Sequence, residues 1–182
     1  NIIFSMRNIP NFITLLNLAS GFIALVFASN GALVTASWFI LAAMIFDFFD
    51  GFAARALKAY SEIGRELDSL ADLVSFGVAP AFLIYKMLVP ALNANIGSDS
   101  TPAINAVLSF IPVIMPACAA LRLAIFNLDT TQKTSFKGLP TPANAIAIIT
   151  VVISAGITSL PFLTWFTVSA TALIIYTVVL SL

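Results

Sequence analysis

Residues 33–72 read LVTASWFILAAMIFDFFDGFAARALKAYSEIGRELDSLAD, and this stretch decides how the chain can fold. It opens with an uncharged, mainly apolar run that ends at Phe46. Four carboxylates then flank a short basic segment: Asp47, Asp50, Asp68 and Asp72. A carboxylate at membrane depth costs at least about 2.5–3.5 kcal/mol on insertion scales. Because four of them bracket one loop, we expect something positively charged to sit among them.

The composition of the whole chain agrees with a membrane setting. Its 182 residues are 60% hydrophobic and 9% charged, whereas soluble domains carry about 25% charged residues. This predicts an all-α integral membrane protein with a single domain over residues 1–182. The net charge of zero gives no indication of nucleic-acid binding. The chain has no histidine and one cysteine, Cys118, so carboxylates must carry any metal or acid–base chemistry.

Six apolar spans are predicted along the chain. Each must be helical, because open sheet edges cannot lie in lipid, and about 20 residues suffice to cross a bilayer. The breaks fall at Gly, Pro, Asn, Asp and charged residues. The expected spans are Phe12–Ser29, Leu33–Leu57, Leu67–Val89, Ala103–Asn127, Pro142–Ile157 and Pro161–Leu182.

The cations predict the orientation of these spans. Of the eight Lys and Arg residues, only Lys86 lies toward the side opposite the acidic loop. Cytoplasmic segments of membrane proteins carry the excess of Lys and Arg. We therefore expect an integral plasma membrane protein with both termini in the cytoplasm and the acidic site at the cytoplasmic face.

The spacing of the aspartates predicts that they converge. Asp47 and Asp50 lie three residues apart, and Gly64, Asp68 and Asp72 follow each other at four-residue steps, so each set shares one helix face. Two helices joined by a short loop are antiparallel neighbours, which would create a cage of carboxylate oxygens. Such a cage suits Mg²⁺, Mn²⁺ or Ca²⁺, and two divalent cations could clamp a diphosphate.

Small and basic residues beside the aspartates support this interpretation. Gly51, Ala54 and Gly64 leave room for a ligand close to the backbone. Arg55 is a fork-shaped donor suited to phosphate oxygens. Two alternatives remain: a salt-bridge network of the acids with Arg55, Lys58 and Arg65, and the ion pathway of an ion-coupled membrane transporter.

The stretch from Asp47 to Asp72 resembles the signature of the CDP-alcohol phosphotransferase family, DxxDGxxARx(7–8)GxxxDxxxD. All eight fixed positions of the signature are matched: Asp47, Asp50, Gly51, Ala54, Arg55, Gly64, Asp68 and Asp72. The resemblance implies a six-helix fold that forms a homodimer.

The resemblance also implies roles for the matched residues. Asp47, Asp50, Asp68 and Asp72 would hold two divalent cations, and Asp72 would act as catalytic base toward the acceptor alcohol. The CDP moiety would contact a set of five residues: Gly51, Ala54, Arg55, Gly64 and Asp68. In a chain without histidine, a carboxylate is the available base.

Weaker similarities extend to the serine-transferring branch of the family. They lie in Ile9–Thr14, Ser75–Pro80, Arg122–Asn127 and Phe136–Pro142. They imply CDP-diacylglycerol or CDP-archaeol as donor, L-serine as acceptor and CMP as product, with the membrane lipid around the site. Inositol phosphate and glycerol phosphate remain alternative acceptors, and a non-catalytic scaffold is a further alternative.

Two groups of residues outside the signature are candidate ligand contacts. Arg122, Asn127 and Lys137 could form a serine pocket, in which a cation meets the carboxylate of the amino acid. Asn11 and Thr14 could contact the nucleotide. The alternatives are a snorkelling Arg122, a plain turn around Lys137 and a helix N-cap near Asn11.

Overall fold

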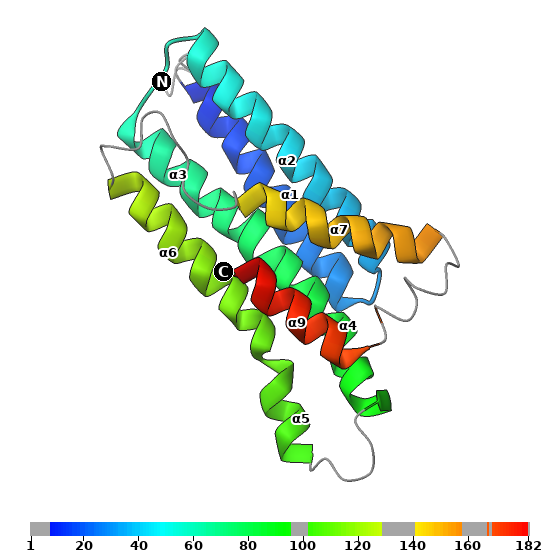
Figure 1. The fold of residues 1–182 in the computed structure, drawn as a ribbon. Coiled ribbons are helices and arrows are strands. Elements are labelled where there is room, and N and C mark those ends of the chain that lie inside the picture. The colour runs from blue at the N-terminus through cyan, green and yellow to red at the C-terminus, as the bar shows by residue number, and fades with distance from the viewer. Residues whose placement is uncertain (1–7, 96–101, 129–140, 158–166, 168, 182) are drawn as a thin grey trace.

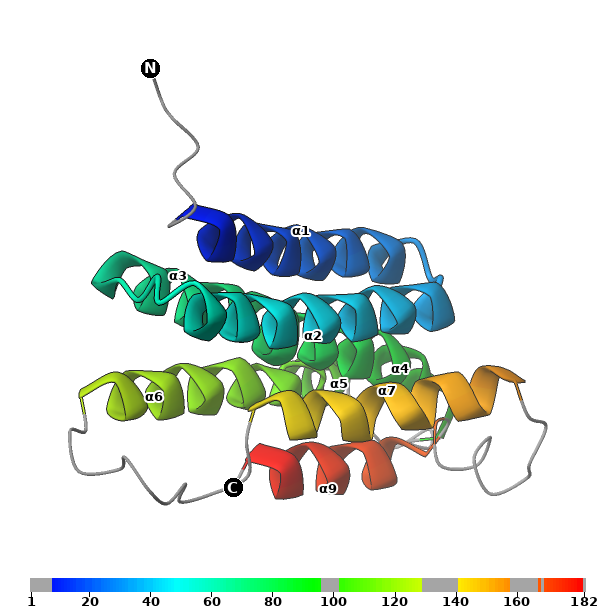
Figure 2. The same cartoon turned by 90° about the horizontal axis from the view of Figure 1, so that it is seen from above.

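The computed structural model describes residues 8–95, 102–128, 141–157, 167 and 169–181. The elements that these residues form are all helical, as the sequence predicts. The helices lie side by side in an elongated bundle (Figure 1), and Figure 2 shows α1 at one edge of the bundle and α9 at the other.

Helices α1 (Ile9–Ser29) and α2 (Leu33–Ala56) form an antiparallel hairpin close to the predicted boundaries. Gly31 has a φ of +81°, which suits glycine at the residue after a helix C-cap. Its N–H donates to the Ala28 carbonyl at 3.0 Å, and the Ala32 N–H donates to the Phe27 carbonyl at 3.0 Å. These two bonds are the Schellman pattern, and they turn the chain sharply into α2.

The third predicted span is longer than expected. It consists of α3 (Glu62–Asp72), the π-helical segment η2 (Leu73–Val78) and α4 (Ala79–Asn95). Glu62–Ala94 is apolar enough to cross a membrane, although its first turns are polar. Ser61 caps this helix, because its Oγ accepts a bond from the Gly64 N–H at 3.0 Å. The hydrophobic pattern could not predict these polar first turns.

The fourth predicted span is interrupted near its start. It comprises α5 (Pro102–Ser109), the 3₁₀ turn η3 (Ile111–Val113) and α6 (Ile114–Leu128). Pro112 lies inside η3, and a proline lacks the N–H that a regular helix would use there.

The last two predicted spans are shorter helices in the described residues. α7 covers Thr141–Ile157 and α9 covers Ala170–Ser181. Within the described ranges, four helical segments are long and apolar enough to cross a membrane: Ile9–Ser29, Leu33–Ala56, Glu62–Ala94 and Ala103–Leu128. The described residues thus support four of the six predicted spans. The predicted start of the last span, Pro161, lies outside the described residues.

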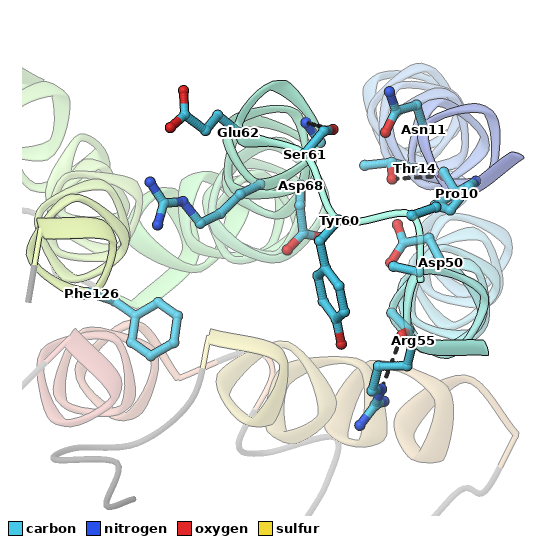
Figure 3. Close-up of a pocket in the computed structure, with 15 residues that line it drawn as sticks. Pro10, Asn11, Thr14, Asp50, Arg55, Tyr60, Ser61, Glu62, Asp68 and Phe126 are labelled. Atoms are coloured by element: carbon cyan, nitrogen blue, oxygen red, sulfur yellow. Dashed lines mark hydrogen bonds between the residues drawn. The ribbon is translucent and has the colours of Figure 1, made fainter. Parts of the chain in front are cut away.

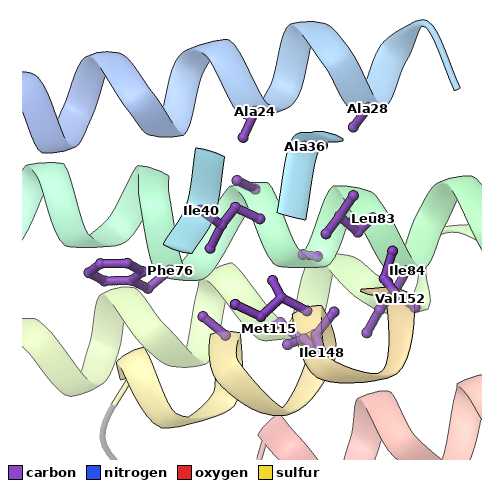
Figure 4. Close-up of a cluster of buried hydrophobic side chains, with 14 of the residues drawn as sticks. Ala24, Ala28, Ala36, Ile40, Phe76, Leu83, Ile84, Met115, Ile148 and Val152 are labelled. Carbon is purple, nitrogen blue, oxygen red and sulfur yellow. The ribbon is translucent and has the colours of Figure 1, made fainter. Parts of the chain in front are cut away.

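A buried apolar cluster ties the bundle together at mid-length (Figure 4). Ile40 of α2, Phe76 of η2, Leu83 of α4 and Ile148 of α7 are all buried within it. Large apolar side chains such as Phe22 and Trp38 are instead exposed, at 62% and 52%. Exposed aromatic residues on apolar helices are what a lipid-facing surface requires.

The end of α2 repeats the Schellman pattern with an unusual residue. The Ala59 N–H donates to the Ala54 carbonyl at 3.0 Å, and the Lys58 N–H donates to the Arg55 carbonyl at 3.2 Å. Lys58 takes the position that Gly31 has in the first hairpin, with a φ of 50°. The left-handed conformation costs a residue with a Cβ roughly 1–2 kcal/mol.

Replacing Lys58 with glycine should therefore stabilise the protein. We expect Lys58→Gly to raise the melting temperature in detergent by about 2–4 °C, as about 1 kcal/mol does in a chain of this size. The matched control is Lys58→Ala, which removes the charge but keeps the strained φ. An equal rise in Lys58→Ala, or a fall in Lys58→Gly, would show that backbone strain is not the cause.

Candidate active site

Two antiparallel helices place three carboxylates together. Asp47 and Asp50 lie in the last turns of α2, and Asp68 lies in α3 beyond the short linker. One carboxylate oxygen from each of the three lies within 4.8 Å of the others. Asp50 is only 5% exposed, and the other two are half-buried. The predicted convergence of the two helices is thus confirmed for three of the four aspartates.

The three carboxylates have too few partners within the protein. Asp50 Oδ2 and Asp68 Oδ1 are buried and accept no hydrogen bond from any described residue. A buried, unpaired charge is strongly unfavourable. Three oxygen ligands of like charge, two with orphaned buried atoms, fit a hard divalent cation. The donor set therefore matches the type of ion that the sequence predicts.

The alternative interpretation, a salt-bridge network of the aspartates with the nearby cations, is not seen among the described residues. Among the residues that the structure describes, none of the four aspartates pairs with Arg55, Lys58 or Arg65. Arg65 instead lies 3.8 Å from Glu66, and both side chains are well exposed. Pairs of this kind stabilise a protein by only about 0–1 kcal/mol.

Asp72 lies one turn beyond Asp68 and outside the group of three. It is close enough to Asp47 and Asp68 to interact with them electrostatically. Its Oδ1 accepts a hydrogen bond from Asn17 Nδ2 of α1 at 3.2 Å. Asn17 was not predicted from the sequence, although its polar side chain lies in an apolar span and shares one helix face with Thr14.

A cavity of about 810 Å³ opens beside the carboxylates. Its walls come from α1, α2, the α2–α3 linker, α3 and α6, and Figure 3 shows Asp50 and Asp68 turned toward the space between their helices. Ligand pockets usually measure about 300–1,000 Å³. All seven residues predicted to contact CDP line this cavity: Asn11, Thr14, Gly51, Ala54, Arg55, Gly64 and Asp68.

The two signature glycines serve different purposes. A Cβ on Gly64 would lie 2.9 Å from both Asn11 Oδ1 and Ser61 Oγ, so glycine lets α1 approach the start of α3. A Cβ on Gly51 would meet only Arg55 Nη2, at 3.9 Å, so glycine there keeps the cavity open. The Arg55 side chain is held against the preceding turn of α2, because its Nε donates to the Gly51 carbonyl at 3.0 Å.

Several lining residues were not predicted from the sequence. Tyr60 and Ser61 come from the linker, which a search for helical faces does not cover, and Tyr60 reaches into the cavity (Figure 3). Phe126 of α6 also lines the cavity. Its side chain is one residue from the predicted Asn127, so the sequence indicated the right segment of α6.

The predicted serine-pocket residues lie elsewhere or outside the described ranges. Asn127 Nδ2 donates to Ser69 Oγ at 2.9 Å and to Glu66 Oε2 at 3.5 Å, which joins α6 to α3. Neither Asn127 nor Arg122 is among the residues that line the cavity. Lys137 lies outside the described residues. Their role in binding an acceptor stays a prediction.

The fold and the site define a helical membrane protein that gathers carboxylates beside a cavity of nucleotide size. Comparison with known proteins specifies the class: residues 7–182 match the CDP-alcohol phosphatidyltransferase family. The chain belongs to this family, whose members are enzymes of phospholipid synthesis.

Several curated proteins are similar over most of the chain. A CDP-diacylglycerol–serine O-phosphatidyltransferase of Bacillus subtilis is 38% identical over 79% of this chain and 75% of its own length. The archaetidylserine synthase of Methanothermobacter thermautotrophicus is 34% identical over 77% of this chain and 55% of its own. A CDP-diacylglycerol–serine O-phosphatidyltransferase of Methanocaldococcus jannaschii is 35% identical over 80% of this chain and 62% of its own length. The chain thus spans between about half and three quarters of these relatives.

Filling the cavity from Gly51 should block nucleotide binding without disturbing the fold. We expect Gly51→Leu to weaken the binding of CDP in the presence of Mn²⁺ by about tenfold or more, equivalent to at least about 1.4 kcal/mol. Isothermal titration of the purified protein measures the affinity.

The matched control is Ala56→Leu, which adds the same side chain on an exposed position of α2 that does not line the cavity. It should bind CDP as the unmodified protein does. Full CDP affinity in Gly51→Leu would show that the nucleotide binds elsewhere.

Proposed function

We propose that the chain transfers the phosphatidyl or archaetidyl group of a CDP-lipid to the hydroxyl of L-serine and releases CMP. One observation carries the proposal. All five signature residues expected to contact CDP line a single cavity, directly beside three converging carboxylates. The names of the similar bacterial and archaeal proteins support serine as acceptor and leave both lipid types open.

The CDP moiety would occupy the cavity between α1, α2 and α3. Arg55 at the rim offers guanidinium donors to phosphate oxygens. The first turn of α3 also faces this space through Ser61, Glu62 and Gly64, and a helix N-terminus attracts anionic groups. Exposed Tyr60 supplies an aromatic surface at the cavity mouth.

Carboxylates would hold the metals that the reaction requires. Two divalent cations, Mg²⁺ or Mn²⁺ and alternatively Ca²⁺, held by Asp47, Asp50, Asp68 and Asp72, would neutralise the diphosphate and the charge on the leaving CMP. Asp50 and Asp68 line the cavity and also belong to the group of three, so they connect the metal site to the nucleotide site.

Asp72 would accept the proton of the attacking alcohol. The serine hydroxyl oxygen forms a bond to the phosphorus that carries the lipid, the bond from this phosphorus to the CMP oxygen breaks, and CMP leaves. Asn17 engages Asp72 Oδ1, so we assign Oδ2 as the oxygen that takes the proton.

The acceptor is the least constrained part of the proposal. Arg122, Asn127 and Lys137 remain the candidates for the serine pocket. Phosphorylated acceptors such as inositol phosphate or glycerol phosphate need several cations, and the described cavity wall contributes Arg55 and Arg65. That cationic lining is sparse, which favours an acceptor without a phosphate group. An ion-coupled transporter is the distant alternative.

We also propose that the chain is one domain over residues 1–182 with six spans, as its length and apolar runs predicted, and that it forms a homodimer, as the family resemblance implied. The distribution of cations predicted the orientation, with both termini and the active site on the cytoplasmic side of the plasma membrane. Lys86, the one cation toward the other side, has a local role that supports this orientation. Its Nζ donates to the Ser29 carbonyl at 3.0 Å and caps the far end of α1.

The reaction can be tested by CMP release from CDP-diacylglycerol or CDP-archaeol by the purified protein. Serine, inositol phosphate and glycerol phosphate are supplied separately, with and without Mn²⁺ or Mg²⁺. We expect metal-dependent release with serine. Asp72→Asn should lower it by about 10²–10⁴-fold, the usual contribution of a general base.

Glu66→Gln is the matched control, because it makes the same kind of change on α3 at an exposed residue that does not line the cavity, and the amide oxygen can still accept the hydrogen bond from Asn127. It should retain CMP release. Release with a phosphorylated acceptor instead of serine would refute the acceptor assignment. Absence of release with every donor and acceptor, in protein that binds Mn²⁺, would refute the transferase and favour the transporter.

A further inference from the structure

Asn17 is a buried polar residue that contacts the proposed base, Asp72, and is not among the residues that line the cavity. It is 0% exposed in the middle of α1, an apolar helix. Its Nδ2 donates to Asp72 Oδ1 at 3.2 Å, while its own Oδ1 is buried and has no partner among the described residues. A buried polar atom without a partner costs about 1–3 kcal/mol, so packing alone favours an apolar residue here.

The backbone around Asn17 is fixed from the opposite side. Ser75 Oγ donates to the Asn17 carbonyl at 3.1 Å, and Ser75 is itself fully buried. Gly21, one turn further along α1, allows this contact, because a Cβ on Gly21 would collide with the side chain and backbone of Ser75. The helix of Asn17 and the helix of Asp72 are therefore in close contact beside these two residues.

The helix that carries Asp72 changes its geometry at this point. Asp72 is the last residue of α3, and the π-helical segment η2 begins at Leu73. π-helical turns shift the side chains that follow them around the helix axis and often occur at functional sites. Here the π-helical segment follows Asp72, the carboxylate that Asn17 contacts. It contains Ser75, which hydrogen-bonds to the backbone of α1.

We infer that Asn17 is a positioning residue, whose carboxamide holds the Asp72 carboxylate in the orientation needed to accept the proton of the acceptor alcohol. This role rests on the proposed function. A carboxylate side chain can rotate, and one hydrogen bond from a rigid helix restricts that rotation. Residues that orient a catalytic or metal-binding carboxylate typically contribute 10–100-fold to activity or affinity.

The inference can be tested with Asn17→Leu, which keeps the number and branching of the side-chain heavy atoms and removes the donor. We expect kcat for CMP release to fall about 10–100-fold, while KM for the CDP-lipid and the affinity for CDP stay unchanged. The binding measurement detects displacement of α1, because Pro10, Asn11 and Thr14 of α1 line the nucleotide cavity. A loss of CDP affinity parallel to the loss of kcat would show a merely structural role.

A double mutant separates positioning from independent effects. If Asn17 acts through Asp72, Asn17→Leu should lower the residual kcat of Asp72→Asn no further. If the double mutant instead loses kcat by the product of the two single-mutant factors, the inference is wrong. Thr177→Val is the control for loss of a buried hydrogen bond, because Thr177 is 0% exposed and its Oγ1 donates to the Leu173 carbonyl at 2.7 Å in α9. It should keep kcat.

The outcomes distinguish this inference from the function on which it rests. Unmodified protein that releases no CMP refutes the proposed function. Active unmodified protein, inactive Asp72→Asn and fully active Asn17→Leu refute the inference alone.

Discussion

Like charges held close together between α2 and α3 are the constraint on which the rest of the structure depends. Asp47, Asp50 and Asp68 bring their carboxylates within 4.8 Å, and two of their oxygens are buried without a protein donor. A divalent cation at the site would offset the repulsion and give the orphaned oxygens a partner. Three surrounding features bear on this site: a short linker that brings α2 and α3 to one cavity, a glycine where α1 comes close to α3, and the cavity itself beside the carboxylates.

One face of α1 serves both the site and the core. Its buried positions follow each other at steps of three and four residues, which forms a seam: Pro10, Thr14, Asn17, Gly21, Ala24 and Ala28. The first half of this seam is polar and faces the cavity and Asp72. The second half consists of small residues, which let membrane helices pack closely. The same helix thus sets the distance between helices and the orientation of the acidic residues.

The sequence predicted those features that depend on periodicity and local spacing. The two helices of the first hairpin, and the face of α2 that Asp47 and Asp50 share, follow from helical geometry. The π-helical segment after Asp72 could not be predicted, because it depends on packing of Ser75 and Gly77 against α1 and α6 rather than on residue pattern. The placement of Asn127 against Ser69 and the reach of Tyr60 into the cavity are likewise tertiary results. Asn17 was missed because the spans were judged by their apolar residues.

Binding of Mn²⁺, followed by electron paramagnetic resonance of the purified protein with CDP, tests the shared-cation account most directly. The account predicts two bound ions close enough for their spins to couple, with loss of at least one in Asp50→Asn and full retention in Glu66→Gln. A folded protein that binds no Mn²⁺, or that binds it equally well in Asp50→Asn, would contradict the account.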